Sequence, residues 1–339
     1  MKRVRTLVLA VTMVVGCGLL AACGSSDEPT TLDSKYNLEP PKELKQAAGG
    51  ETAKLVVGGK NFFAEQDILG YITLAALDAA GAQGIDKIDL GSTQQVRSAL
   101  LDGTIDMYWG YTGTGALIHL AQADPPRDPH QLYKLVAKLD LKKNNIVWLP
   151  PAPANNTYAI ATRAEVFKQG TADYDKDLAQ VKTISDLARL VKQHPDKATI
   201  CVGPEFERRA DGLPGLESRY GFKFPEANVF VYPAEAVYNA LDVGQKCNYG
   251  SVFNDNGNIS HLKLRILPDN EHFFPAYNPS LTMRKETLDR YPDLKPMFTD
   301  IARRLDSKTM RHLTEKVLVD HQPAKQVAKQ WLEEQGLMS

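Results

Sequence analysis

Apolar residues recur along the first half of the chain in two alternating patterns. Short apolar runs typical of buried strands occur at residues 54–57, 85–90, 105–109 and 146–149. Between them, apolar residues follow the helical spacing at 65–80, 93–101 and 132–139. Strands that alternate with helices predict a mainly parallel sheet with helices on its faces.

A proline-rich segment, Pro150–Thr157, separates this set of elements from a second one. Prolines so closely spaced are excluded from the interior of a sheet, so we interpret the segment as a crossover between domains. Predicted strands follow at 158–161, 199–202, 229–232 and 252–253, with helices near Ser185 and at 213–220. The second set of elements therefore predicts a second sheet.

A second crossover is predicted at Phe273–Pro279, followed by a strand at 281–284 and three amphipathic helices that end at Trp331. Two crossovers imply that one domain is built from both ends of the chain and that the other is inserted between them. We therefore predict an α/β fold in which residues 53–153 and 276–339 form domain I and residues 154–275 form domain II. Such a pair of domains can close around a ligand.

The N-terminus has the pattern of a secretory leader. Basic residues precede an apolar run from Leu7 to Val15, which predicts a signal peptide over residues 1–22. Leu20-Ala21-Ala22-Cys23 is similar to a bacterial lipobox, so Cys23 is the predicted site of lipidation, with Cys17 as an alternative. The polar segment 23–52 then predicts a flexible tether, and an exported protein held at a membrane surface, on its periplasmic or extracellular face.

Charge and cysteine content narrow the class of protein further. The formal net charge is −1, and removal of three basic residues with the leader leaves about −4, which is a poor basis for binding nucleic acid. No segment after the leader is apolar enough to span a bilayer. In an oxidising compartment, the two remaining cysteines, Cys201 and Cys247, predict a disulfide rather than a metal or redox pair.

Motifs for catalysis are missing from the sequence. It contains no zinc-protease, nucleophile-elbow, phosphate-loop or dinucleotide-binding motif, and His130, His194 and His272 lie in loop-like contexts that indicate surface positions. We therefore expect no cofactor, no metal and no enzymatic activity. The pattern favours a binding protein.

The segment Asp106–Gly115 is the strongest candidate for a ligand site. It ends a predicted buried strand in aromatic residues and continues through hydroxyls and glycines, at the position where open α/β sheets place their ligands. Glycines allow backbone N–H groups to approach a ligand, and aromatic faces attract cations. Core packing of the same rings is the competing interpretation.

Four motifs occur together in a characteristic order: Val57–Phe62, Thr104–Thr114, Pro151–Tyr158 and Phe273–Asn278. With them, the chain from about Lys54 to its C-terminus resembles the substrate-binding proteins of ABC importers for glycine betaine and related quaternary amines. The resemblance implies a type II periplasmic-binding-protein fold. It also implies partners: an ABC permease and its ATPase subunit, with this protein as a monomer.

The family's ligand chemistry follows from the ligand itself. A quaternary ammonium donates no hydrogen bond, so shape and aromatic faces must recognise it, at about 2 kcal/mol for each desolvated contact. By resemblance, the ammonium cage is formed by Tyr111, Tyr158, Phe253 and Tyr277. Lys60, Thr114 and Arg209 match the residues that hold the carboxylate, with Arg208 as the rival of Arg209 because an alignment slip of one residue would exchange them.

Two features depart from the resemblance or lie outside it. Phe253 lacks the hydroxyl that a tyrosine would carry, so any ligand or closure contact made by that group is lost. Tyr108 and Trp109 have no assigned role, and strand alternation turns one of them away from the cleft.

The predicted function is capture of glycine betaine, or a related osmoprotectant, and its delivery to a membrane permease. Two alternatives stay open. The same fold could bind choline, carnitine, proline betaine or an amino acid, and choline, which has no carboxylate, would not depend on Lys60 and Arg209. A protein of a different class, an exported ligand sensor or enzyme, could use the same scaffold.

Overall fold

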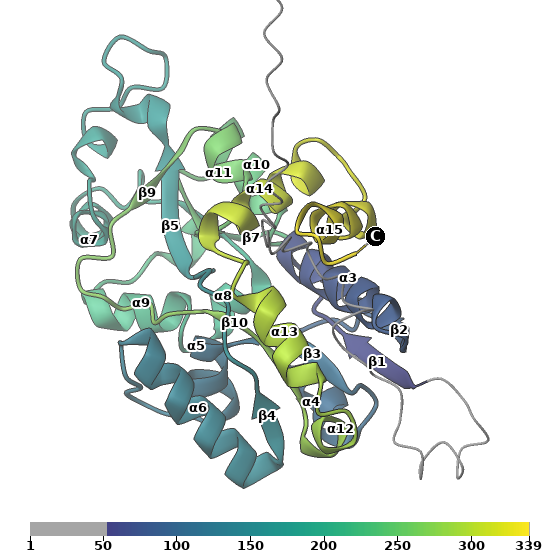
Figure 1. Ribbon diagram of the computed structural model, residues 1–339. Coiled ribbons are helices and arrows are strands. Elements are labelled where there is room, and N and C mark those ends of the chain that lie inside the picture. The colour runs from purple at the N-terminus through teal and green to yellow at the C-terminus, as the bar shows by residue number, and fades with distance from the viewer. Residues whose placement is uncertain (1–52, 339) are drawn as a thin grey trace, which may run out of the picture.

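The computed structural model describes residues 53–338 and arranges them around two five-stranded sheets (Figure 1). The first sheet has the order β2-β1-β3-β10-β4 and the second has the order β7-β6-β8-β5-β9. Strand β10 lies late in the chain but pairs inside the first sheet, whereas β5 to β9 form the second sheet without any strand from either end. The two-domain α/β fold expected from the sequence is therefore confirmed.

The strands of the first sheet are β1 (Lys54–Gly58), β2 (Gln83–Lys87), β3 (Met107–Tyr111), β4 (Ile146–Trp148) and β10 (Pro279–Arg284). Those of the second sheet are β5 (Tyr158–Arg163), β6 (Ile200–Val202), β7 (Val229–Val231), β8 (Tyr249–Phe253) and β9 (Leu264–Leu267).

Both sheets are mixed but mainly parallel, as predicted, since four strands of each run in one direction and a single strand runs against them. In the first sheet β1 runs parallel to β2 and β3, but β10 is antiparallel to β3 and β4. In the second sheet β6 is parallel to β7 and β8, but β5 is antiparallel to β8 and β9. Strands β5 and β10 are the two that follow the crossovers. Each enters its sheet from the neighbouring domain and so runs against the strands built by helix crossovers.

Helices of the first domain precede and follow the inserted domain. They are α3 (Ala64–Ala79), α4 (Thr93–Asp102), α5 (Thr112–Thr114), the π-helical turn Gly115–His119, α6 (Pro129–Asn144), α12 (Lys285–Arg290), α13 (Leu294–Ala302), α14 (Ser307–Leu318) and α15 (Ala324–Glu334). Four helices therefore follow β10 where three were predicted.

The inserted domain carries α7 (Ile184–Gln193), α8 (Pro204–Arg208), α9 (Leu213–Tyr220), α10 (Ala236–Val243) and α11 (Asn258–His261). Three short 3₁₀ turns lie at Ala164–Phe167, Leu178–Gln180 and Glu226–Asn228. The sequence pattern did not predict α8, α10, α11 or β9.

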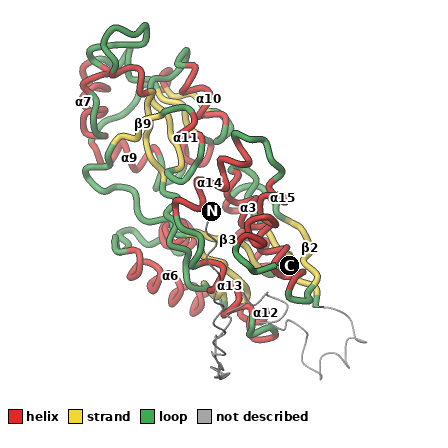
Figure 2. Tube along the Cα trace, turned by 45° about the horizontal axis from the view of Figure 1, so that its top comes forward, coloured by secondary structure: helices red, strands yellow, loops and turns green. Residues whose placement is uncertain are grey.

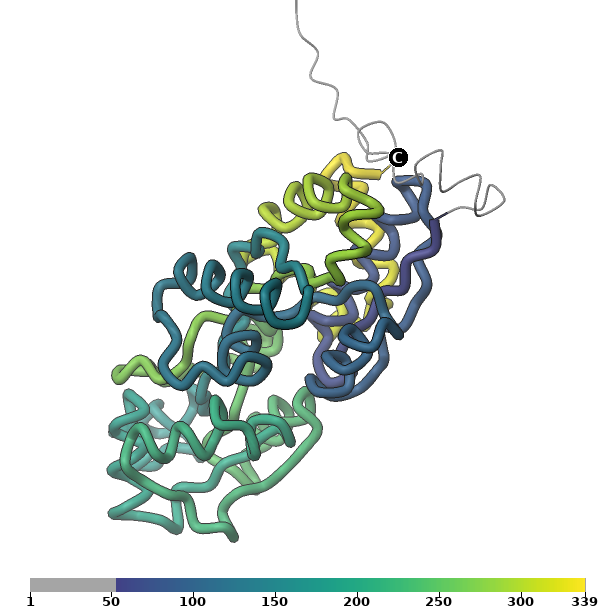
Figure 3. The backbone as a smooth tube through the Cα atoms, turned by 90° about the horizontal axis from the view of Figure 1, so that it is seen from below, coloured from purple at the N-terminus to yellow at the C-terminus, as the bar shows by residue number. Residues whose placement is uncertain are grey.

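The two ends of the chain lie together, apart from its middle. Figure 3 shows the early and late segments of the chain at one end of the molecule and the segments near residues 160–260 at the other. In Figure 2, α7, α9 and α10 lie at one end, while α3, α12 and α15 lie at the other. Helix α3 packs against α15 and α14, so the N-terminal and C-terminal segments share one core.

Three observations bear on the predictions about the chain's compartment. Cys201 and Cys247 are joined by a disulfide with a Cα–Cα distance of 5.6 Å. None of the helices between residues 53 and 338 is long and apolar enough to cross a membrane. The predicted signal peptide, the lipidation site Cys23 and the tether lie outside the described residues.

Candidate ligand-binding site

Strand β3 delivers one aromatic residue to the cleft between the domains and buries two others. Tyr111 belongs to the cluster of aromatic residues between the domains, while Trp109 and Tyr108 lie in the two cores on opposite faces of the first sheet. Trp109 Nε1 donates to Thr73 Oγ1 at 2.8 Å, which fixes the ring in the core beneath α3. Tyr108 and Trp109 are therefore core residues, and both point away from the cleft.

The turn after Tyr111 brings the second crossover against it. Strand β10 pairs with β3 so that Pro279 lies opposite Tyr111, and Tyr277 enters the cleft two residues earlier. A Cβ atom on Gly113 would come within 2.9 Å of the Tyr277 ring and of the Ala276 carbonyl oxygen. A glycine at position 113 is thus required for Tyr277 to approach so closely.

Six aromatic rings meet between the domains. Phe62 and Phe63 follow β1, Tyr111 ends β3, Tyr277 lies before β10, and Tyr158 and Phe253 are a cross-strand pair on β5 and β8. Tyr158 and Phe253 stack with centroids 5.1 Å apart, and Phe253 stacks on Phe63 at 4.9 Å. Phe63 lies 5.9 Å from Tyr111, and Tyr158 lies 5.8 Å from Tyr277. The four rings predicted from the sequence therefore line a single cavity.

Phe62 and Phe63 were not predicted as site residues. Their position in the sequence could have indicated this role, because the two rings follow Lys60 and Asn61 in the loop after the first strand. A loop at the end of a parallel strand faces the ligand crevice. Asn156, which also lines the cavity, was missed although it belongs to the first crossover.

Lys60 is buried with its ammonium group against these rings. Its Nζ lies 4.7 Å from the Tyr111 centroid, 5.6 Å from Phe63 and 5.8 Å from Phe62. Burial lowers the pKa of Lys60 to about 8, although the carboxylate of Glu205 acts to raise it. The rings therefore already accommodate a cation that belongs to the protein itself.

Arg209 lies at the polar end of the cavity, and its guanidinium is paired with two carboxylates. It donates to Asp211 from Nε at 2.7 Å and from Nη2 at 2.5 Å, and to Glu205 from Nη1 at 2.8 Å. Longer contacts of 3.4 Å reach Thr114 Oγ1 and Thr93 Oγ1 on the other domain. The weak threonine contacts are the ones that a ligand carboxylate could replace.

The structure separates Arg209 from its rival. The side chain of Arg208 is 79% exposed, whereas that of Arg209 is 12% exposed and lines the cavity. Arg208 ends α8 and turns its guanidinium to solvent beside Glu207. Lys60, Thr114 and Arg209, the three residues expected at the carboxylate end, all line the same cavity.

Tyrosine hydroxyls at the back of the cavity are held by carboxyl groups. Tyr277 donates to Asp211 Oδ2 at 2.5 Å, and Tyr111 donates to Glu65 Oε1 at 2.6 Å. Burial, reinforced by the neighbouring carboxyl group, raises the pKa of Tyr111 and of Tyr277 well above the usual value. Both phenols therefore stay protonated and present neutral, electron-rich rings.

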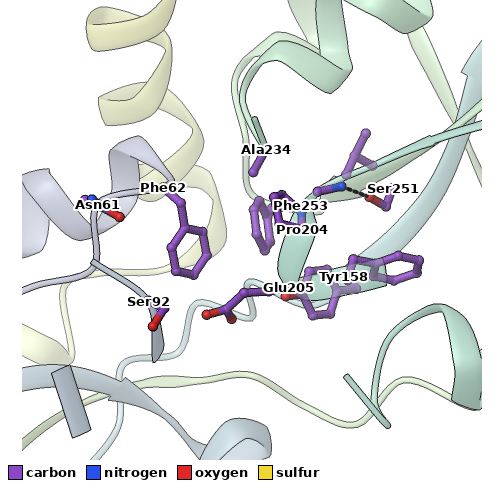
Figure 4. A pocket seen from close by; sticks show the side chains of 12 residues that line it. Asn61, Phe62, Ser92, Tyr158, Pro204, Glu205, Ala234, Ser251 and Phe253 are labelled. Carbon is purple, nitrogen blue, oxygen red and sulfur yellow. Dashed lines mark hydrogen bonds between the residues drawn. The ribbon is translucent and has the colours of Figure 1, made fainter. Parts of the chain in front are cut away.

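The enclosed space is small and adjoins a larger pocket. The six rings, Lys60, Thr114, Asn156 and Arg209 surround about 20 Å³, which is room for about one water molecule. Phe62, Tyr158 and Phe253 also line a neighbouring pocket of about 200 Å³ (Figure 4). In Figure 4 the Glu205 carboxylate lies below Phe62 and is directed toward the side of the pocket that carries Ser92. A ligand larger than water can enter the cage only if rings or domains move.

Two carboxylates of the inserted domain cap helices of the first domain. Glu205 accepts from the backbone N–H of Thr93 at 2.8 Å, at the first residue of α4. Glu235 accepts from the backbone N–H of Ala64 at 3.2 Å, at the first residue of α3, which has no side-chain cap of its own. Burial acts to raise the pKa of Glu205, but Lys60 and Arg209 outweigh it and lower the pKa. A negative charge is stabilised at a helix N-terminus, so both carboxylates favour the arrangement in which the two domains are in contact.

These features define a class: a two-domain α/β protein with a cavity, lined by aromatic rings, between the domains. No cluster of His, Cys, Asp or Glu within residues 53–338 is arranged to hold a metal ion. The chain belongs to the OpuAC family, the substrate binding domain of ABC-type glycine betaine transport systems, whose sequence profile matches residues 53–334. It is thus a substrate-binding component of an ABC transporter for glycine betaine or related quaternary amines.

Individual relatives agree with the family. The chain is 31% identical to the glycine betaine-binding protein YehZ of Escherichia coli K12, over 84% of this chain and 92% of the relative. It is 33% identical to a glycine-betaine-binding protein of Pseudomonas aeruginosa PAO1, over 86% and 91% respectively. The solved structure of apo YehZ from Escherichia coli matches with a TM-score of 0.60 and 29% identity, over 85% of this chain and all of that structure.

Proposed function

We propose that this protein captures glycine betaine, with the ammonium group held by Tyr111, Tyr158, Phe253, Tyr277 and Phe63 and the carboxylate held by Lys60, Thr114 and Arg209. The observation that carries this proposal is the buried Lys60 ammonium, which lies against two of these rings, Tyr111 and Phe63, and against the neighbouring Phe62. A site that holds one cation against ring faces suits another cation that forms no hydrogen bond.

A ligand with both charges explains the composition of the cavity better than a simple cation does. Lys60 and Arg209 carry two positive charges, and Arg209 is already balanced by Asp211 and Glu205. When a ligand ammonium occupies the Tyr111 face, Lys60 must leave it, and a ligand carboxylate is the partner that receives the lysine. A zwitterion therefore satisfies both ends of the site.

Delivery of the ligand to the permease depends on closure of the two domains around it. Residues of the cage come from both domains, so a bound ligand links them, and Arg209 reaches Thr93 and Thr114 across the interface. A permease can distinguish loaded from empty protein only through a difference in shape. We propose that the exported protein, anchored through a lipid on Cys23, presents the closed form to its permease, whose ATPase subunit drives transport.

Titration calorimetry of the purified protein tests the cage. Glycine betaine, proline betaine, carnitine, choline and amino acids are titrated into wild type, Tyr111→Ala and the control Tyr133→Ala, whose ring lies on α6 away from the cleft. We expect glycine betaine to bind wild type and the control, and to bind Tyr111→Ala about thirtyfold more weakly, the equivalent of about 2 kcal/mol.

Two results would contradict the proposal. Unchanged affinity in Tyr111→Ala would remove this ring from the cage, and an absence of heat with every quaternary amine would remove the ligand class. A Lys60→Met variant separates the alternatives, because choline has no carboxylate and its binding should survive that substitution, while betaine binding should weaken.

A further inference from the structure

Glu65 is a buried carboxyl group behind the cage to which the proposed function gives no task. It is the second residue of α3 and is 3% exposed. Its Oε1 accepts the Tyr111 hydroxyl at 2.6 Å, but its Oε2 is buried without a hydrogen-bond partner. An ionised carboxylate in this position would leave one charged oxygen unsatisfied, which is strongly unfavourable.

The hydrogen bonds at Tyr111 specify where a proton would sit on Glu65. Gln66 Nε2 donates to the Tyr111 hydroxyl at 3.0 Å, so that hydroxyl donates its own proton to Glu65 Oε1. Oε1 is therefore an acceptor, and a neutral Glu65 carries its proton on Oε2. Asn156, whose side chain interacts with both Glu65 and Tyr111, has an Oδ1 atom that is buried and lacks a donor.

We propose that Glu65 is a positioning residue for the ammonium cage, protonated before a cationic ligand arrives and ionised, with release of that proton to solvent, when the ligand's permanent positive charge occupies the face of Tyr111. The inference rests on the proposed function. It adds that capture of a quaternary amine is coupled to proton release, through the hydroxyl that joins Glu65 to the ring.

The charges around Glu65 allow it to titrate. Burial raises the pKa of Glu65 to about 8, opposed by the Tyr111 hydrogen bond. Asp255 acts to raise it further and Lys60 acts to lower it, while Tyr238 on α10 faces it as a neutral phenol and Glu235 caps the preceding residue. The N-terminus of α3 favours the ionised form. On binding, the ligand's ammonium takes the place of Lys60 on the Tyr111 face, while Lys60 stays in the cavity beside the ligand's carboxylate, so that two cations lie near Glu65 in place of one. An added cation about 6 Å away lowers a carboxyl pKa by about one to three units.

Ionisation of Glu65 on binding makes the affinity for betaine depend on pH. Below about pH 8 the free protein holds the proton, so binding must expel it and weakens as the pH falls, by up to about tenfold per unit. Above about pH 8 Glu65 is already ionised and contributes no further slope. Lys60 has the opposite effect, because it loses the charge that meets a carboxylate as pH rises through about 8.

The experiment measures glycine betaine binding to the full chain between about pH 6 and about pH 9. Calorimetry in buffers of different ionisation enthalpy counts the protons exchanged by wild type, Glu65→Gln and the control Glu217→Gln. Glu217 is a half-buried carboxyl on α9 whose pKa burial also raises, and it caps Phe224 far from the rings. Difference infrared spectroscopy follows the C=O stretch of a protonated buried carboxyl as ligand is added.

We expect wild type and Glu217→Gln to release protons and to lose a protonated-carboxyl band on binding. Glu65→Gln should lack that band, release fewer protons and bind about tenfold or more weakly near pH 8, but lose little affinity near pH 6. A variant that merely destabilised the cage would weaken binding at every pH. If betaine binds to wild type and to Glu65→Gln with the same proton count and the same pH profile, the role of Glu65 is wrong and the proposed function stands. If wild type does not bind betaine at all, the proposed function is wrong as well.

Discussion

At the residue scale, the site consists of ring faces in front and carboxyl groups behind. Tyr111 and Tyr277 direct their hydroxyls to Glu65 and Asp211, which orients the rings and keeps their faces toward the cavity. Phe253 has no hydroxyl to anchor and is held by stacking between Phe63 and Tyr158. The departure from a tyrosine at this position thus leaves the ring face in place, because packing rather than a hydrogen bond orients it.

Phe253 provides a test of whether the ring face or the apolar volume matters. Phe253→Leu keeps an apolar side chain but removes the π face, so betaine affinity should fall about tenfold or more, whereas Phe253→Tyr should bind as wild type does. Both variants are titrated by calorimetry, and thermal unfolding monitors folding. Equal affinities in Phe253→Leu and wild type would mean that this ring only packs.

At the element scale, the N-termini of α3 and α4 meet the inserted domain. Each helix directs free backbone N–H groups at the interface, and each receives a carboxylate from across it, Glu235 on Ala64 and Glu205 on Thr93. Asn256 Nδ2 holds Glu235 in place at 3.0 Å. These contacts exist only when the domains are together, so they stabilise the closed form without touching the cavity centre.

Removing one cap should shift the molecule toward the open form. We expect Glu235→Ala to weaken betaine binding about threefold to tenfold, because a helix cap contributes about 1 kcal/mol. Small-angle scattering should show a larger radius for the ligand-free variant than for ligand-free wild type. Asp128→Ala, which removes a cap on α6 within the first domain, is the control for general helix destabilisation. Equal scattering and affinity in Glu235→Ala and wild type would refute the role of Glu235.

At the scale of the whole molecule, each domain has a core of its own, a further cluster of rings joins the two, and the disulfide found within residues 53–338 belongs to the inserted domain. Cys201 on β6 and Cys247 before β8 close a loop with a sequence separation of 46 residues. Both sulfur-bearing residues are buried behind α10. The bond therefore stabilises the inserted domain and leaves the first domain to its apolar packing.

Reduction of this bond should destabilise the inserted domain selectively. A loop of this length gives about 4 kcal/mol from the entropy of the unfolded chain. We expect a Cys201→Ser/Cys247→Ser variant to unfold at lower denaturant, with probes in the inserted domain moving first. A thiol assay of the unreduced, denatured wild type should find neither cysteine free. Two reactive thiols would show that the exported protein lacks the bond.

Most elements and most site residues follow from local patterns. Apolar spacing predicted β1, α3, α4 and β3 to within two residues, because each element buries one face of a regular period. Strand β9 and helix α10 were missed because their apolar runs are short and lie among polar turns. Lys60, Tyr111, Tyr158, Phe253 and Tyr277 were named from motifs, and they meet in one cavity.

The class of fold and four of the six aromatic rings in the cavity follow from the sequence, since they depend on local periodicity and on motif order. The reversed direction of β5 and β10 is seen only in the folded molecule, because it depends on where each crossover re-enters its sheet. The tertiary structure also decided that Arg209 is already paired and that Glu65 stands behind Tyr111. Such pairings join residues far apart in the chain, and no local pattern encodes the distance between them.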